Sequence, residues 1–405
     1  MVLWADALTH LRRTMKITDI EAIAVVWPAP EKHFWTAFRP IGRVSEMVVR
    51  VHTDDGIIGI GEAHGAGMPF PGIYQQKEDG TIEASGASRI VVDVLKPLLV
   101  GEDPLDTERL WEMMFRLNHH VGWASKGWGR PQIMTAMAGV DIALWDIKGK
   151  AARMPVYKLL GGTRNTVPCY ITGGYYQEGK TTEDLTQECA SYVDMGYNAI
   201  KLKIGGVSVE EDVERVGAVR DTVGPNVDLM LDVNEGYDVP TAIRAAHLME
   251  PFNIRWLEEP VHWYDRVTGL GQVAASTSIP IASGENAAHR WDARDLIMQG
   301  GIRVMQFDCT RSSGITECLK VASLCAMQNV RLAPHHDPQI HGHLVAALPV
   351  GEILETFPTA ERDPVWAELF TVRPEIHNSK MTLLDQPGWG IELNEDTLQA
   401  RGAWA

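Results

Sequence analysis

Residues 199–205 read Ala-Ile-Lys-Leu-Lys-Ile-Gly, a short β-rich run that ends in a glycine. Runs of the same kind recur near residues 167, 198, 228, 254, 279, 302, 330 and 351, at intervals of 21 to 31 residues. A helical pattern fills each interval, for example at 209–223 and at 240–250. Eight successive units of strand, loop and helix predict an α/β fold, a (β/α)8-type barrel.

A doubly wound open sheet is the alternative architecture. Such a sheet normally places a Gly-rich phosphate-binding loop after its first strand. The first run here is followed by Thr172-Gly173-Gly174-Tyr175, which does not match that fingerprint. The barrel is therefore the favoured interpretation.

The chain before the repeats begins with a β-meander over residues 15–65. Strands are expected at 47–53 and 57–62, joined by the turn Asp54-Asp55-Gly56. Met15 opens the first strand of this region and is the natural start of the fold. Residues 1–14 are expected to be a tail, because they lack the long apolar core of a signal peptide.

Helical patterns occupy residues 86–160. Within them, small residues are frequent at 136–150, as close helix packing requires. The last fifty residues contain acidic loops and Gly388-Trp389-Gly390-Ile391, and we expect them to fold back onto the first domain.

Composition excludes several classes of protein. The net charge of −16 disfavours nucleic acid as a partner, because phosphate backbones attract basic surfaces. No apolar run approaches the roughly 20 residues of a membrane span. The cysteines are scattered and none forms Cys-x-x-Cys, which favours a reducing, cytoplasmic location over a disulfide framework. They are Cys169, Cys189, Cys309, Cys318 and Cys325.

Chemistry in a barrel is carried at the C-terminal ends of the strands. Lys201 and Lys203 are two residues apart on one expected strand, so both point into the barrel mouth. The next three strands each end in a carboxylate, namely Asp232, Glu258 and Glu285. Three converging carboxylates repel one another unless a cation lies between them. A set of oxygen ligands without Cys or His favours Mg²⁺ over Zn²⁺.

The remaining strand ends carry further ionisable groups. Asp308 and His335 lie opposite the carboxylates, and Glu355 lies on the last strand. A carboxylate beside an imidazole fixes its tautomer and raises its basicity, which suits a general acid or base. Each residue alone has a structural explanation, such as a helix cap or a solvated face. The joint pattern, with an ionisable group at the end of seven successive strands, favours a catalytic site.

These residues resemble the enolase superfamily, specifically the mandelate racemase subgroup, from Met15 onward. The resemblance rests on Lys201-x-Lys203, the three carboxylates, Glu355 and the Asp308/His335 pair. The spacings agree, with 29 residues from Lys203 to Asp232 and 27 from Asp308 to His335.

The resemblance implies a barrel of the (β/α)7β variant beneath an N-terminal α+β capping domain. The domains expected are a tail at 1–14, the cap at 15–140, the barrel at 141–365 and a segment returning to the cap at 366–405. A homo-oligomer, from a dimer to an octamer, is expected with it.

Loops of the cap, at 27–39 and 65–74, would close the site. The residues expected to touch substrate are His33, Phe34, Trp35 and Asn234, with ordinary packing the equal alternative for the first three. His119 and His120 carry no clear role, and His341 and His343 are expected to pack.

The implied chemistry is removal of the proton next to a carboxylate, with one Mg²⁺ ion and Lys201 stabilising the enediolate. Glu355, protonated, would donate a hydrogen bond to the same group. Lys203 and His335 would act on opposite faces of the substrate, with the pKa of Lys203 depressed by nearby positive charge.

The favoured reaction is dehydration of a sugar acid, an aldonate or aldarate, to a 2-keto-3-deoxy acid. Racemisation or epimerisation and the cycloisomerisation of a lactone proceed through the same enolate. Both remain alternative reactions.

Two other classes also stay open. An aldolase could use Lys201 or Lys203 as a Schiff base, although 334–338 and Glu355 suit its usual phosphate site poorly. A catalytically silent binding barrel has no reason to retain the whole set of charged residues.

Overall fold

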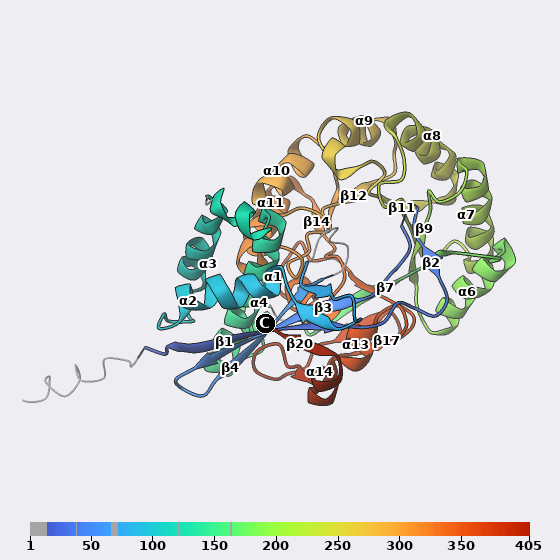
Figure 1. Ribbon diagram of the computed structural model, residues 1–405. Coiled ribbons are helices and arrows are strands. Elements are labelled where there is room, and N and C mark those ends of the chain that lie inside the picture. The colour runs from blue at the N-terminus through green and yellow to red at the C-terminus, as the bar shows by residue number, and fades with distance from the viewer. Residues whose placement is uncertain (1–13, 38, 66–71, 120, 163) are drawn as a thin grey trace, which may run out of the picture.

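The computed structural model describes residues 14–37, 39–65, 72–119, 121–162 and 164–405. Nearly all of the predicted tail at 1–14 lies outside these residues. In Figure 1 the barrel helices form a ring around the barrel strands, and the N-terminal domain lies to one side of the ring. Among the described residues, no helix combines the length and the apolar character needed to cross a membrane.

Parallel strands make up the barrel, in the order β14-β13-β12-β11-β10-β9-β7, and β15 pairs with β7 to close it. These strands begin within three residues of the eight predicted positions. They are β7 (Thr166–Gly173), β9 (Ala199–Lys203), β10 (Asp228–Asp232), β11 (Ile254–Glu258), β12 (Ile281–Ser283), β13 (Val304–Met305), β14 (Arg331–Leu332) and β15 (Leu354–Thr356).

A helix of nine or more residues follows each barrel strand except the last, which is followed only by the short C-terminal segment helix α13 (Pro364–Glu368), so the described chain forms the (β/α)7β variant. Helix α7 covers the predicted range 209–223 without change, and α8 is displaced by one residue from 240–250. The helices are α6 (Thr182–Asp194), α7 (Val209–Val223), α8 (Val239–Met249), α9 (Thr268–Ser276), α10 (Arg290–Met298), α11 (Gly314–Gln328) and α12 (Pro338–Ala347).

Beneath the mouth, the barrel interior is filled by one layer of side chains, with one residue from each strand or its flank. Such a layer makes the barrel a packed core with a floor under its polar mouth. Its members are Tyr170, Ala199, Met230, Trp256, Ala282, Val304, Ala333 and Ile353.

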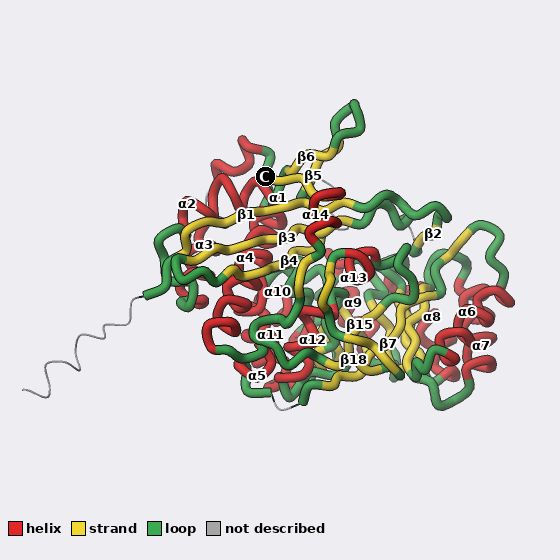
Figure 2. Tube along the Cα trace, turned by 90° about the horizontal axis from the view of Figure 1, so that it is seen from below, coloured by secondary structure: helices red, strands yellow, loops and turns green. Residues whose placement is uncertain are grey.

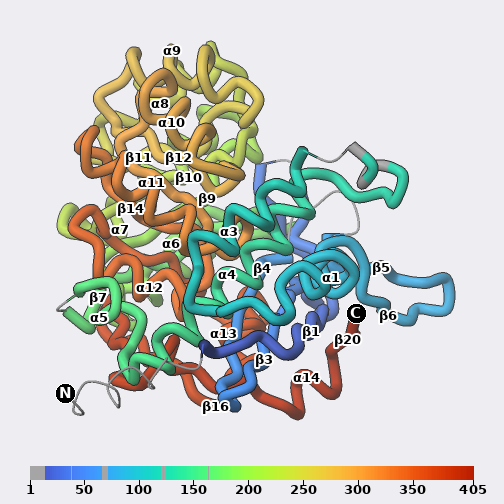
Figure 3. Tube along the Cα trace, turned by 90° about the vertical axis from the view of Figure 1, so that its left-hand side faces the viewer, coloured from blue at the N-terminus to red at the C-terminus, as the bar shows by residue number. Residues whose placement is uncertain are grey.

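The capping domain is built on an antiparallel sheet of order β20-β1-β3-β4. Its strands are β1 (Ile17–Val26), β3 (Ser45–Thr53), β4 (Ile58–His64) and β20 (Gly402–Trp404). The helices are α1 (Ala87–Ile90), the π-helix η1 (Val91–Leu95), α2 (Lys96–Leu99), α3 (Thr107–Phe115), the 3₁₀ helices η2 (Arg116–His119) and η3 (Val121–Lys126), α4 (Arg130–Ala152) and α5 (Val156–Leu159). In Figure 2 the strands β1, β3 and β4 lie above the barrel strands β15 and β7, and in Figure 3 the cap helices α1, α3 and α4 appear above β1 and β3.

Helix α4 packs directly on β4, and glycines permit the approach. A Cβ atom placed on Gly61 would lie 1.9 Å from the carbonyl oxygen of Gly139, so no larger residue fits there. The small residues predicted at 136–150 therefore form this contact. The domain boundary predicted between residues 140 and 141 falls inside this continuous helix, because the whole helix is needed to cover the cap sheet.

The C-terminal segment joins both domains. Strand β20 pairs with β1, so that Trp404 lies opposite Ile23 in the cap sheet. Strand β18 (Lys380–Thr382) instead pairs with β7 of the barrel and with β17 (Glu375–His377). The rest of the segment comprises α13 (Pro364–Glu368), β16 (Phe370–Val372), β19 (Glu392–Leu393) and α14 (Glu395–Arg401).

Short elements complete the loops. Strand β2 (Phe34–Trp35) pairs with β8 (Tyr176–Gln177) and so brings a cap loop to the barrel mouth. The others are β5 (Tyr74–Gln76), β6 (Ile82–Ala84) and the 3₁₀ helices η4 (Glu250–Phe252) and η5 (Trp263–Asp265).

Candidate active site

Strand register aligns the central charged residues in a row. Lys203 on β9 is opposite Asp232 on β10, and Asp232 is opposite Glu258 on β11. All three lie at C-terminal strand ends and are at most 6% exposed. Lys201 faces the same way one step deeper and is 1% exposed. The predicted convergence of these groups in the barrel mouth is therefore present.

Lys201 binds two buried carboxylates at once. Its Nζ lies 2.6 Å from Oε1 of Glu258 and 2.9 Å from Oε1 of Glu355. Burial lowers its pKa, but the charges of Glu258 and Glu355 outweigh burial, and the net pKa is well above the usual value. Lys201 is therefore a fixed positive charge on the barrel axis.

Lys203 forms an ion pair and hydrogen bond with Asp232. Burial lowers the pKa of Lys203, but the Asp232 carboxylate outweighs it, so the pKa lies above the usual value. The predicted depression of this pKa depends on Mg²⁺ as well as on Lys201, so it stays a prediction for the metal-bound protein. In the chain by itself, the Asp232 carboxylate is the dominant charge beside Lys203, because strand register imposes that contact.

Glu355 also departs from its predicted state. Its Oε1 accepts from the Thr172 hydroxyl at 2.6 Å and lies 2.9 Å from Lys201, while its Oε2 accepts from the backbone N–H of His336 at 3.1 Å. Burial raises its pKa, but Lys201 and further cations hold the pKa well below the usual range. Glu355 is therefore an ionised acceptor, and the prediction that it is protonated and donates is wrong.

His335 and Asp308 form the predicted pair. Nδ1 of His335 lies 2.8 Å from Oδ2 of Asp308, and Nε2 lies 3.7 Å from Oε2 of Glu285. Burial lowers the pKa of His335, but Glu285 and Asp308 outweigh it and the pKa is raised. The hydrogen bond to Asp308 therefore fixes the orientation of the ring, so that Nε2 faces the carboxylates.

Arg311 is a site residue that the sequence did not single out. Its guanidinium Nη1 lies 3.1 Å from Oε1 of Glu285, at 7% exposure. Burial raises the pKa of Glu285, but His335 and Arg311 outweigh burial and bring it to about 2. The available signal was its place three residues after Asp308, in the loop at the same end of the barrel.

Two more buried acids, Glu235 and Glu259, border the site. Asn286 Nδ2 donates to both, at 3.2 Å to Oε1 of each. Burial, with the charge of Glu285, raises the pKa of Glu235 to about 8. The sequence marked Glu259 only as the second residue of an acid–acid–Pro strand end.

The donor set of Asp232, Glu258 and Glu285 fits Mg²⁺. All three are buried carboxylates on neighbouring strands, and hard oxygen ligands suit this ion. Each carboxylate has a cationic ion-pair partner within the chain. The nearest is Lys203 for Asp232, Lys201 for Glu258 and Arg311 for Glu285. Burial and the charge of Asp232 raise the pKa of Glu258 to about 7, so a further positive charge beside it would favour its ionised form.

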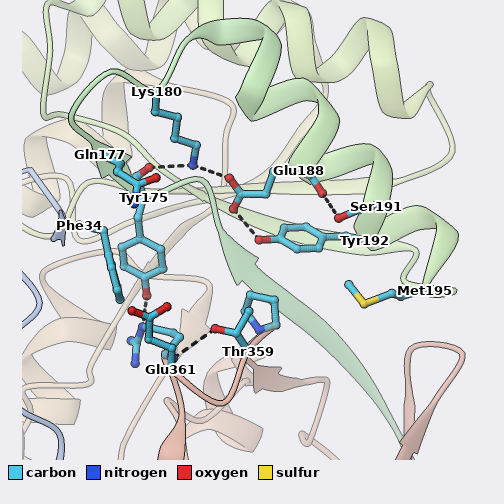
Figure 4. Close-up of a pocket in the computed structure, with 12 residues that line it drawn as sticks. Phe34, Tyr175, Gln177, Lys180, Glu188, Ser191, Tyr192, Met195, Thr359 and Glu361 are labelled. Carbon is cyan, nitrogen blue, oxygen red and sulfur yellow. Dashed lines mark hydrogen bonds and ion pairs between the residues drawn. The ribbon is translucent and has the colours of Figure 1, made fainter. Parts of the chain in front are cut away.

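A cavity of about 450 Å³ lies beside the mouth, between the cap loop, α6 and the loop after β15. Figure 4 shows Phe34 from the cap and Tyr175 from the barrel at one wall. Their rings are 5.1 Å apart, and Nζ of Lys203 lies 5.5 Å from the Tyr175 ring centre. Tyr175 accepts a hydrogen bond from Nε of Arg362 at 2.7 Å. Tyr175 therefore separates this cavity from the charged site.

The other residues predicted to touch substrate differ in how far they are buried. Trp35 is half-buried on β2, and His33 is exposed. Asn234 is buried, and its backbone N–H donates to Oδ1 of Asp232 at 2.9 Å. Of the predicted cap contacts, Phe34 packs on Tyr175, whose ring lies near Lys203.

Two histidines of α12, His341 and His343, form structural hydrogen bonds. Nε2 of His341 accepts from the backbone N–H of Cys309 at 3.1 Å, and Nδ1 of His343 accepts from that of Tyr157 at 3.1 Å. Both are buried, in agreement with the predicted packing role. His119 ends η2, and His120 lies outside the described residues.

Comparison with known families agrees with this architecture. Residues 18–161 match the family model of the mandelate racemase / muconate lactonizing enzyme N-terminal domain. Residues 184–397 match that of the enolase C-terminal domain-like family.

Individual proteins are similar over most of their length. The chain is 33% identical to the arabinonate dehydratase of Saccharolobus solfataricus over 359 residues, which are 87% of this chain and 89% of that protein. It is also 33% identical to the L-talarate/galactarate dehydratase of Salmonella typhimurium over 359 residues, covering 88% of this chain and 82% of that protein.

A solved structure of a mandelate racemase/muconate lactonizing enzyme from a marine actinobacterium, in complex with magnesium, superposes with a TM-score of 0.82. The two chains are 33% identical, and the superposition covers 96% of this chain and 99% of the solved one. The fold, the row of charged strand ends and both family matches lead to one assignment. The chain belongs to the mandelate racemase subgroup of the enolase superfamily.

Proposed function

We propose that the protein is an Mg²⁺-dependent sugar-acid dehydratase, which converts an aldonate or aldarate to a 2-keto-3-deoxy acid. The observation that carries this proposal is the pair of nitrogen groups, Lys203 and the Asp308-bound His335, that flanks one set of buried carboxylates. Similarity to an arabinonate dehydratase and to an L-talarate/galactarate dehydratase supports the reaction class. The magnesium complex of a similar protein supports the choice of ion.

Asp232, Glu258 and Glu285 would hold one Mg²⁺, which supplies the positive charge that an enediolate needs. Lys201 adds a second fixed charge, because it is buried and held by Glu258 and Glu355. Glu355 orients Lys201 instead of donating to the substrate.

Proton transfer is assigned to Lys203 and His335. Neutral Lys203 takes the α-proton through Nζ, and it becomes neutral once Asp232 no longer accepts from it. His335 donates its Nε2 proton to the β-hydroxyl as the C–O bond breaks, and water leaves. The enol that remains takes up a proton at carbon 3, loses the proton of its carbon 2 hydroxyl group to water, and becomes the 2-keto acid. Asp308 stabilises the imidazolium before the transfer and fixes which nitrogen acts.

A substrate screen tests the reaction. Protein loaded with Mg²⁺ is incubated with a library of mono- and diacid sugars, and 2-keto acid formation is measured. We expect one acid or a small related group to give keto acid. Exchange of the α-proton with D₂O but no keto acid would establish a racemase or epimerase instead. Activity that survives EDTA, together with a borohydride-trapped lysine adduct, would establish the aldolase.

Two variants test the assigned roles. Lys203→Ala and His335→Asn should each abolish dehydration. If Lys203 is the base that takes the α-proton, His335→Asn should still exchange this proton with D₂O, and Lys203→Ala should not. Wild-type turnover in both variants would refute the assignment of these residues.

A further inference from the structure

A second set of buried ionisable side chains lies outside the catalytic row, where the cap meets the barrel. Glu46 on β3 and Glu62 and His64 on β4 face His336 and Asp337 in the loop after β14. Their exposures are 0%, 0%, 6%, 2% and 1% in that order. Their possible ligand atoms form two groups, Glu46/Glu62/Asp337 and His64/His336/Asp337. In each group, one such atom from every residue lies within 4.8 Å of the others.

The positive charge in this cluster is incomplete. Among the described residues, the ion-pair partners of its carboxylates are the two imidazoles, with His64 near Glu46 and Asp337, and His336 near Asp337. Neither Lys nor Arg is paired with these acids in the described structure. Gathering three carboxylates in a dry interior is costly unless protons or a cation offset their charge.

Several atoms of the cluster have no hydrogen-bond partner among the described residues. They are both carboxylate oxygens of Glu46, Oε1 of Glu62 and Nδ1 of His64. Buried polar atoms are nearly always paired, so a group of four such atoms at one point needs an explanation. By contrast, Oε2 of Glu62 accepts from Gln339 at 2.7 Å, and Oδ2 of Asp337 accepts from Thr310 at 2.5 Å.

The separations match those between ligands of one metal ion. Nδ1 of His64 lies 3.4 Å from Oε2 of Glu46 and 3.9 Å from Oδ2 of Asp337. Ligands at about 2.1 Å from a common ion are roughly 3–4 Å from one another. Mixed imidazole and carboxylate donors suit zinc, iron or manganese better than they suit Mg²⁺.

We propose that His64, His336 and Asp337 bind a divalent transition-metal ion, with Glu46, whose Oε2 lies 3.4 Å from Nδ1 of His64, and Glu62 completing the site. Its ligands come from both domains, so the ion would fasten the cap sheet to the loop that carries His335. This site is separate from the magnesium ligands and does not depend on the proposed reaction.

The competing explanation is that the cluster keeps protons in place of an ion. Burial and the charge of Asp337 hold the pKa of Glu46 and of Glu62 well above the usual value, so neutral carboxyl groups would also remove the repulsion. Metal content distinguishes the two explanations.

The test is Zn²⁺ binding to the full chain by equilibrium dialysis in excess Mg²⁺, with elemental analysis. The excess Mg²⁺ competes with Zn²⁺ for the catalytic carboxylates. We expect one bound Zn²⁺ per wild-type chain, and at least a tenfold lower occupancy in the double variant Glu46→Gln/His64→Gln. Zn²⁺ should also raise the melting temperature of the wild type and not that of this variant.

A matched control comes from the same sheet. Glu21 and His52 form a carboxylate–imidazole pair at 3.6 Å, part-exposed and remote from the cluster. Glu21→Gln/His52→Gln should retain one Zn²⁺. Absence of bound Zn²⁺ in the wild type, or full binding in Glu46→Gln/His64→Gln, would overturn the proposal. If the cluster variant does not fold, absence of bound Zn²⁺ from the wild type still overturns the proposal, and the single variant Glu46→Gln takes the place of the double variant.

Discussion

Nδ1 of His335 lies 2.8 Å from Oδ2 of Asp308, which joins the loops after two successive barrel strands. The other oxygen, Oδ1 of Asp308, accepts from Thr310 and from the backbone N–H of Arg311. Both oxygens are therefore used, and the carboxylate cannot rotate away from the ring. The arrangement presents Nε2 of His335 to the centre of the mouth, where Glu285 lies.

Removing the charge of Asp308 should slow catalysis more than it changes the fold. In Asp308→Asn the imidazolium of His335 loses its nearest negative charge, so its proton is present less often. We expect kcat for keto acid formation to fall by about 10²–10⁴-fold. Asp385→Asn is the control, because Asp385 is paired with Lys158 at the surface. A loss below threefold in Asp308→Asn, with circular dichroism unchanged, would contradict the assigned role.

Lys201 should be required for stability as well as for catalysis. Lys201→Met leaves Glu258 and Glu355 buried without their shared cation. The loss of one partner from a buried ion pair costs about 3–5 kcal/mol of the free energy of unfolding. Urea denaturation measures this value. Lys158→Met, at a surface pair, should cost only about 0–1 kcal/mol. Equal unfolding energies for the two variants would show that the buried charges are compensated elsewhere.

Removal of Mg²⁺ should abolish turnover reversibly. Dialysis against EDTA takes away the charge that the enediolate requires, and added Mg²⁺ should restore the rate. Glu285→Gln should raise the Mg²⁺ concentration for half-maximal rate by at least about tenfold, since it removes one anionic ligand. Glu375→Gln, at an exposed position on β17, is the control. Full activity after EDTA treatment would exclude Mg²⁺ as the cofactor.

Stability should fall as the pH rises, and Asp141 contributes to this fall. Asp141 on α4 accepts from the backbone N–H and hydroxyl of Thr316 on α11, at 2.9 and 2.6 Å. Burial raises its pKa from 3.8 to about 7. A raised carboxyl pKa means that the folded state holds the proton more tightly than the unfolded state. Its contribution is therefore complete below about pH 4 and is lost as the pH rises through about 7.

The size of this effect is about 4 kcal/mol, from about 1.4 kcal/mol per pKa unit. Urea denaturation at pH 5 and pH 8 should give a smaller difference for Asp141→Asn than for the wild type. An equal pH difference in the two proteins would show that Asp141 is ionised in the folded state at both pH values.

The sequence by itself determined the barrel fold and which charged residues lie at the C-terminal ends of its strands. Strand, loop and helix repeat at a nearly constant interval, and side chains alternate along a strand, so Lys201 and Lys203 had to face the same way. The end of each parallel strand then fixed where Asp232, Glu258 and Glu285 would gather. These are local patterns, and local patterns can be read from one chain.

Only the tertiary structure decided the charge states. Glu355 is ionised because Lys201, Thr172 and the backbone of His336 reach it from three elements distant in sequence. Lys203 is protonated because strand register brings Asp232 to it. The position of Arg311 in the site depends on the path of the loop after β13. The cluster around Asp337 assembles only when the cap sheet packs on the barrel. A pKa reflects the distances to every neighbouring charge and to water, and those distances exist only once the chain has folded.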